Sequence, residues 1–130
     1  MILLDSDVMI DLMRQYPPAL IWFDSLSDEE ELTLPGFVVM ELIQGCRNKT
    51  EQQKIEKELA AYEVIWPSAE ICDAALVVFA RYHLQQNFGI FDALIAQMAV
   101  SLNLPLHTFN QKHYVAIPNL QTVQPYRRTS

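Results

Sequence analysis

The N-terminal stretch Met1-Ile2-Leu3-Leu4-Asp5-Ser6-Asp7 constrains the fold most strongly, because an apolar run there meets two carboxylates. An apolar run of this length that ends abruptly in acids is typical of a buried strand in a parallel sheet. Asp5 would then lie at the carboxyl end of that strand, where open α/β sheets bind their ligands. We therefore expect a functional site at this end of the sheet, which two distant acids, Glu41 and Asp92, would join.

Short strands and helices alternate along the rest of the chain. Further strands are expected at residues 32–34, 64–66, 106–108 and 120–123, and helices at 8–14, 17–26, 37–46, 50–61, 68–87 and 92–102. Alternation of this kind predicts a parallel sheet that is covered on both faces. The expected fold is a three-layer α/β/α sandwich with a mainly parallel sheet of about five strands, formed by residues 1–130 as a single domain.

The composition excludes several classes of protein. The chain has 130 residues and is 51% hydrophobic, which is too apolar for a disordered chain. No apolar run approaches the length of a membrane span, and the N-terminus lacks the features of a signal peptide. Cys46 and Cys72 have no metal-binding spacing, so we expect both thiols to be reduced and buried. A cytoplasmic protein without a membrane partner is expected.

The formal net charge of −7 argues against a nucleic-acid partner, because proteins that bind phosphates usually carry a basic excess. Bulk charge does not decide the matter, since a site made of carboxylates is itself acidic and bound cations reverse its local sign. Most of the basic residues are interpreted as solubilising surface; those that could touch a phosphate backbone are Arg14, Arg47, Lys49, Lys112, Arg127 and Arg128.

Asp5, Asp92 and Asn110 each lie next to an expected strand end or helix start, so the topology can bring them together. Glu41 lies beside the apolar stripe of its helix. Gly45, one turn further on, lowers helix propensity, which suggests close packing or a needed gap at that position. Asp7 is interpreted as the N-cap of the helix at 8–14, with a metal or water contact as the alternative.

Clustered carboxylates repel each other and lose hydration unless a cation compensates them. Oxygen ligands select Mg²⁺ or Mn²⁺ rather than zinc, and the natural chemistry of such ions is transfer of a phosphoryl group to water. No histidine has zinc-binding spacing, and neither a glycine-rich phosphate loop nor a Ser-His-Asp order is evident.

Four segments together resemble those of a known family. They are Leu3-Leu4-Asp5-Ser6, then Met40-Glu41-Leu42 with Gly45, then Asp92-Ala93-Leu94-Ile95-Ala96, and finally Thr108-Phe109-Asn110-Gln111-Lys112-His113-Tyr114. The chain resembles a PIN domain, and most closely the VapC-like toxins of bacterial toxin–antitoxin pairs. The segments run in the family's order over essentially the whole chain, and the Asp-Ala-Leu-Ile-Ala segment is the most specific of them.

The resemblance implies a ribonuclease that depends on Mg²⁺ or Mn²⁺, with RNA as substrate, an antitoxin as protein partner and, commonly, a homodimer. By position, Asp5, Glu41 and Asp92 match the family's metal-binding acids. Many relatives have a further acid near Asn110 or at His113, which this chain lacks. Asn110 could offer its carbonyl oxygen or hold a metal-bound water, and His113 could contact substrate or merely pack.

Two other functions remain open on the sequence. Asp5-Ser6-Asp7 resembles the opening of phosphatases of the haloacid-dehalogenase type, in which the first aspartate is the nucleophile, although no later lysine stands in an obvious motif. The missing fourth acid favours a second alternative, a catalytically weak PIN-like binding module that acts mainly through its partner.

Overall fold

The computed structural model describes residues 1–85 and 87–128, and a five-stranded parallel sheet forms its centre. The strands are β1 (Ile2–Leu4), β2 (Leu32–Pro35), β3 (Glu63–Ile65), β4 (Leu106–His107) and β5 (Thr122–Val123). Their order in the sheet is β3-β2-β1-β4-β5. All five expected strands are present, with ends that differ from the expected ones by one or two residues.

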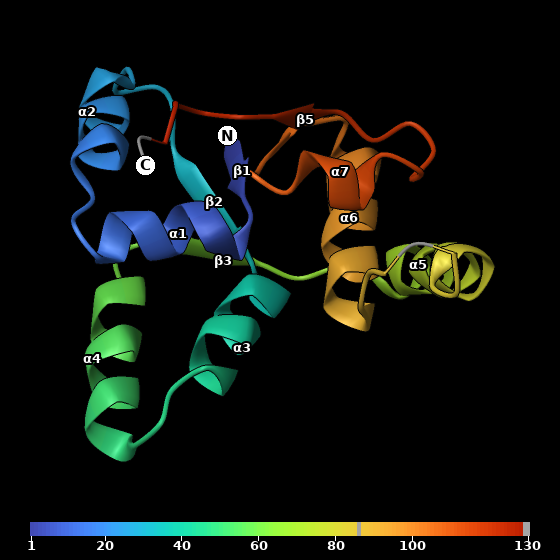
Figure 1. The fold of residues 1–130 in the computed structure, drawn as a ribbon, viewed down its shortest axis with the longest axis horizontal. Helices are drawn as coiled ribbons and strands as arrows, with labels where there is room; N and C mark the ends of the chain where they lie inside the picture. Colours follow the sequence, from blue (N-terminus) through green and yellow to red (C-terminus); the bar gives the residue numbers. More distant parts are fainter. Residues whose placement is uncertain (86, 129–130) are drawn as a thin grey trace.

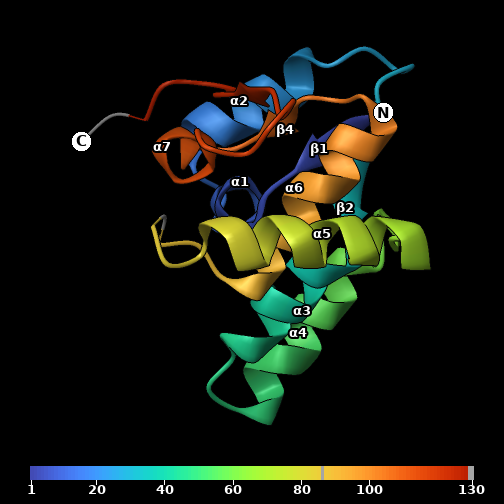
Figure 2. The same ribbon diagram turned by 90° about the vertical axis from the view of Figure 1, so that its right-hand side faces the viewer.

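Helices lie on both sides of this sheet. They are α1 (Ser6–Met13), α2 (Pro17–Ser25), α3 (Gly36–Gln44), α4 (Lys49–Leu59), α5 (Ala69–Tyr82), α6 (Ile90–Leu102) and α7 (Gln111–Tyr114). Helices α5 and α6 lie together on one side, whereas α1 and α2 lie on the other (Figures 1 and 2). The expected three-layer α/β/α fold is confirmed.

Strand β1 is the central strand and is buried along its whole length. Leu3 and Leu4 are fully enclosed, and β1 pairs in parallel with β2 on one edge and with β4 on the other. A strand that is covered on both faces has no need for polar residues, which explains the uninterrupted apolar run in the sequence. The first acid after the run, Asp5, therefore marks the point where the chain leaves the core.

Helix α6 packs deep in the molecule, as its nearly all-apolar sequence predicts. It contacts both α5 and α3. Its buried face contains three alanines, which allow neighbouring helices to approach closely; the buried residues are Ala93, Ile95, Ala96, Met98 and Ala99. This packing fixes the first turn of α6, and with it Asp92.

The strand order reverses between β1 and β4. From β1 the chain adds β2 and β3 on one side, and it then returns to add β4 and β5 on the other. A reversal of this kind leaves a crevice at the carboxyl ends of the two strands, because their following loops diverge in opposite directions. Asp5 follows β1 and Thr108 follows β4, so both residues lie at this reversal.

Two helices begin at other residues than expected. Asp5, not Asp7, is the N-cap of α1, and it accepts a hydrogen bond from the backbone N–H of Ser6. Gly89 is the N-cap of α6, and Asp92 lies in the first turn of this helix rather than at its start. Aspartates close together in sequence compete for the same capping position, so local pattern alone does not separate them.

Two further differences concern the second half of the chain. Helix α5 ends at Tyr82, several residues before the expected end; residue 86 of the expected helix lies outside the described residues. The segment after β4, for which no helix was expected, forms the short helix α7. A helix of one turn has too few residues to show an apolar period, which is why the sequence pattern missed it.

Gly45 does not show the tight packing that its position suggested. A Cβ atom there would meet only carbonyl oxygens of its own helix, at ordinary contact distances of 3.6 and 3.7 Å. The crowded glycine is Gly36, where a Cβ atom would overlap the indole ring of Trp66. Cys46 and Cys72 are both free, as expected, but they are partly exposed rather than buried. No helix within the described residues is long and apolar enough to span a membrane.

Candidate functional site

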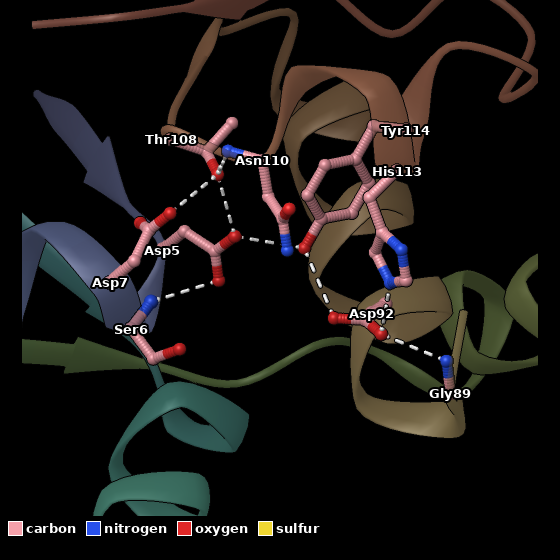
Figure 3. A network of polar contacts seen from close by, with 9 residues as sticks. All are labelled: Asp5, Ser6, Asp7, Gly89, Asp92, Thr108, Asn110, His113 and Tyr114. Atoms are coloured by element: carbon pink, nitrogen blue, oxygen red, sulfur yellow. Dashed lines mark hydrogen bonds and ion pairs between the residues drawn. The ribbon is translucent and has the colours of Figure 1, made fainter. Parts of the chain in front are cut away.

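Asp5 is the most enclosed acid of the site, with only 5% of its surface exposed. Its Oδ1 accepts the Ser6 N–H at 2.8 Å, and its Oδ2 accepts the hydroxyls of Thr108 at 2.9 Å and Tyr114 at 3.0 Å (Figure 3). Burial, together with the negative charge of Asp7, raises the pKa of Asp5 to about 6, although these three hydrogen bonds oppose the shift. Residues from both ends of the chain thus hold this carboxylate in place.

Asp7 joins the start of α1 to the end of β4. One of its oxygens accepts the Val8 N–H at 2.8 Å, and the other accepts the Phe109 N–H at 2.9 Å and the Thr108 hydroxyl at 3.2 Å. Burial raises the pKa of Asp7, and these hydrogen bonds oppose the rise. The expected capping role is wrong, because Asp5 is the N-cap of α1 and Asp7 lies in the first turn of that helix. The second oxygen of Asp7 joins two segments that are distant in sequence.

Asp92 faces Asp5 from the first turn of α6. Its Oδ2 accepts the Gly89 N–H at 2.8 Å and lies 2.9 Å from Nε2 of His113, while its Oδ1 accepts the Tyr114 hydroxyl at 3.3 Å. The structure thus brings Asp5 and Asp92 to the two sides of one hydroxyl group (Figure 3). Asp92 supports the helix N-terminus and faces the site at the same time.

Glu41 is the acid of the site without a compensating group. It projects from α3, and its buried Oε1 has no hydrogen-bond partner among the described residues. Burial, together with the negative charges of Asp5, Asp92 and Asp7, raises the pKa of Glu41 to about 7. The other acids therefore repel the charge of Glu41, and the buried Oε1 of Glu41 has no hydrogen bond to any of them.

Asn110 and His113 lie beside the acids of the site. The Asn110 backbone N–H donates to Thr108 Oγ1 at 3.0 Å, and its side chain points toward the space between Asp5 and Tyr114 (Figure 3). His113, which occupies a position where many relatives have an acid, lies against Asp92. Of the basic residues considered for phosphate contact, Arg47 is paired with Glu51 and Arg128 with Asp11.

Thr108 and Tyr114 are site residues for which no role was predicted. Thr108 is fully buried and bonds to Asp5 and Asp7, and Tyr114 bonds to Asp5 and Asp92. Both belong to the segment that carries the family resemblance, which was the available signal. Their contacts depend on the pairing of β1 with β4, which no local pattern reveals.

The donor chemistry of the site suits a hard divalent cation. Its acids offer oxygen ligands only, and the bare, buried oxygen of Glu41 is a polar atom that a cation would satisfy. Within residues 1–85 and 87–128, however, no group of three or more His, Cys, Asp or Glu side chains is arranged so that it could hold a metal ion. The acids are thus gathered but do not form a complete ligand set.

The fold and the site together define the class: an α/β protein with an acidic site where the strand order of its parallel sheet reverses. The family model of the PIN domain matches residues 2–117 of this chain. The chain belongs to the PIN domain family, and the resemblance seen in the sequence is confirmed.

Two curated relatives come from Mycobacterium tuberculosis. Ribonuclease VapC10 is 32% identical over 122 residues, which cover 93% of this chain and 91% of the relative. Ribonuclease VapC19 is 31% identical over 129 residues, covering 92% and 96%. Among solved structures, VapBC-1 from nontypeable Haemophilus influenzae matches with a TM-score of 0.76 and 28% identity, covering 96% of this chain and 98% of that chain.

Two further solved structures have similar folds. VapBC2 from Rickettsia felis, bound to a DNA fragment from its promoter, matches with a TM-score of 0.74 and 25% identity, covering 95% of this chain and 98% of that chain. A toxin–antitoxin complex from Klebsiella pneumoniae matches with a TM-score of 0.74 at 23% identity and shows the fold alone.

Proposed function

We propose that this chain is an endoribonuclease that hydrolyses RNA phosphodiester bonds with the help of Mg²⁺ or Mn²⁺, and that it is the toxin of a toxin–antitoxin pair in the cytoplasm. The proposal is supported by membership of the PIN domain family and by two relatives that are named ribonucleases. The observation that carries it is the meeting of Asp5 and Asp92 at one hydroxyl, beside the unpaired buried oxygen of Glu41.

Asp5, Glu41 and Asp92 would hold the cation, and Asn110 would assist with its amide oxygen. When bound, the ion would supply an activated water and offset the negative charge that develops on the phosphate. Asp5 and Asp92 are oriented by their hydrogen bonds to Ser6, Thr108, Gly89 and Tyr114. Glu41, whose pKa is raised to about 7, is the group of the site that gains most from a nearby positive charge.

An antitoxin partner follows from the solved complexes that this fold resembles. A groove of about 400 Å³ runs between α1, α3 and α4 and begins at Ser6 and Glu41, next to the acidic site. Its lining combines apolar and charged side chains; the apolar ones are Ile10, Met13, Leu42 and Ile55, and the charged ones are Arg14, Glu41, Glu51, Lys54 and Glu58. The antitoxin would bind in this groove through a segment with apolar side chains.

The catalytically weak binding module remains the second candidate, because the described residues hold no complete ligand group for a metal. The phosphatase alternative has less support. Asp5 is almost fully buried and both of its oxygens accept hydrogen bonds, so it is not free to attack a phosphate ester.

The test is cleavage of single-stranded RNA by protein that has been stripped of metal and then supplied with Mn²⁺ or Mg²⁺. We expect no cleavage without added ions, cleavage with them, and a loss of at least about 100-fold in Asp5→Asn and Asp92→Asn. Asp73→Asn, which changes an exposed acid on α5, is the matched control and should cleave like the wild type. Cleavage that survives chelation would refute the metal dependence, and absence of cleavage under all conditions would favour the binding module.

A further inference from the structure

Tyr114 is the largest of the fully enclosed side chains, with 2% of its surface exposed. It ends the short helix α7 and is part of the hydrophobic core, together with residues of β1 and α6. A ring enclosed in this way cannot swing out without opening a cavity in the core. The position of its hydroxyl oxygen is therefore set by the packing of the molecule.

That hydroxyl lies between the two acids. It is 3.0 Å from Oδ2 of Asp5 and 3.3 Å from Oδ1 of Asp92 (Figure 3). A phenol hydroxyl between two carboxylates keeps its proton at neutral pH and acts as the donor. Since one O–H group has one proton, it donates to one carboxylate at a time, and the shorter distance favours Asp5.

The other contacts of the two acids do not connect them to each other. Asp5 is held by Ser6 and Thr108, whereas Asp92 is held by Gly89 and by His113. These partners fix each carboxylate to its own part of the fold. Among the described residues, Tyr114 is the one with hydrogen bonds to both acids, so its hydroxyl couples their positions.

We propose that Tyr114 is a positioning residue whose hydroxyl sets the spacing of Asp5 and Asp92 before a divalent ion binds. This inference rests on the proposed function, in which both acids are ligands. A ligand pair that is already ordered binds an ion more tightly than one that must be ordered on binding. Loss of a group that orients metal ligands typically lowers metal affinity by about 10- to 100-fold.

The test is Tyr114→Phe, which removes the hydroxyl and keeps the ring. The measurement is calorimetric titration of metal-free protein with Mn²⁺ in the absence of RNA. We expect the affinity to fall about tenfold relative to the wild type. The matched control is Tyr126→Phe, which also removes a tyrosine hydroxyl bonded to an aspartate, here Asp11 at 2.7 Å, but away from Asp5 and Asp92. The control should bind Mn²⁺ like the wild type.

Activity gives a second readout that a merely structural role would not produce. RNA cleavage by Tyr114→Phe should be weak at low Mn²⁺ and should recover as the ion approaches saturation. Unchanged Mn²⁺ binding overturns the inference, since the hydroxyl would then have no effect on the ligands. Tighter binding also overturns it, since the hydroxyl would then compete with the ion for the carboxylates. Absence of Mn²⁺ binding by the wild type itself overturns the proposed metal dependence, and this inference with it.

A further measurement requires no substitution, so it decides the matter even if Tyr114→Phe does not fold. In the metal-free wild type, the Tyr114 hydroxyl proton should give an NMR signal that is protected from exchange with water, because the group is buried and hydrogen-bonded. Addition of diamagnetic Mg²⁺ should shift this signal. A signal that does not respond to saturating Mg²⁺ overturns the inference.

Discussion

Glu41 and Asp5 lie in the same site but have opposite surroundings. Every oxygen of Asp5 accepts at least one hydrogen bond, whereas the buried oxygen of Glu41 accepts none. An ionised carboxylate in that position loses hydration and gains nothing from the protein in return. At the residue scale, the ionised Glu41 side chain therefore destabilises the folded, metal-free protein.

A pH dependence of stability follows for the metal-free protein. Because the folded-state pKa of Glu41 is raised from 4.5 to about 7, the folded protein holds this proton more tightly than the unfolded chain. The stability that this group contributes is present at low pH and is lost as the pH rises from its unfolded pKa through about 7. Asp5, with its pKa raised to about 6, acts in the same direction.

We expect the free energy of unfolding in the presence of a chelator to fall between about pH 5 and about pH 8, with about 1–2 kcal/mol of the fall due to Glu41. Denaturant titration at several pH values measures this change. Glu41→Gln keeps the shape of the side chain without its charge and should show a flatter profile. A profile as steep as that of the wild type would contradict this account of Glu41.

At the scale of elements, the ends of two neighbouring strands meet at Gly36 and Trp66. Gly36 follows β2, Trp66 follows β3, and the two strands pair in parallel. The absence of a side chain at Gly36 leaves room for the indole ring, which also makes an edge contact with Phe37 at 5.6 Å between centroids. The start of α3, the helix that carries Glu41, is thus held against the end of β3.

Gly36→Ala should lower the free energy of unfolding by about 1–3 kcal/mol, because the added methyl group displaces the Trp66 ring. The same substitution in a Trp66→Ala background should be neutral or slightly stabilising, since alanine restricts the unfolded chain more than glycine does. A double-mutant cycle followed by thermal or denaturant unfolding measures the coupling. Equal effects in both backgrounds would show that the ring is not the cause.

The elements that the sequence predicted well are those with a strong local signal. β1 and α6 are buried, and buried segments consist mainly of apolar residues, so both could be predicted from residue type alone. The start of α1 was misplaced because Asp5 and Asp7 are both good capping residues, and the choice between them depends on the contact of Asp7 with Phe109. That contact joins segments from opposite ends of the chain.

The same reasoning applies to the site. Asp5, Asp92 and Asn110 could be proposed from the sequence because strand ends and helix starts are recognisable. Thr108 and Tyr114 could not be given roles, because their hydroxyls matter only through the acids that the fold places beside them. Acidic ligands are visible as residue types, whereas the groups that orient them are visible only in three dimensions.

At the scale of the whole molecule, the groove between α1, α3 and α4 predicts where a partner binds. Ile55→Lys places a charge among the apolar residues of the groove and should lower the affinity for the cognate antitoxin about tenfold or more. Gln53→Lys, at an exposed position of the same helix, is the matched control. Calorimetry with the antitoxin, sought as the product of an adjacent small gene, measures both. Equal affinities would exclude this groove as the docking surface.

The homodimer stays a prediction, and the surface of α5 offers a test of it. Leu76 and Val77 are 65% and 66% exposed, which is unusual for large apolar side chains on a helix. If two copies associate through this face, light scattering should report a dimer for the wild type and a monomer for the double variant Leu76→Lys and Val77→Lys. A dimer that persists in the variant would place the interface elsewhere.

The pairing of β1 with β4 also determines when the site can first exist. Leu106, the neighbour of Leu3 in the sheet, is translated long after Leu3. Tyr114, which orients Asp5, is translated later still. A growing chain that has not yet reached Tyr114 therefore lacks the contacts that assemble the site, however early its first acid has been made.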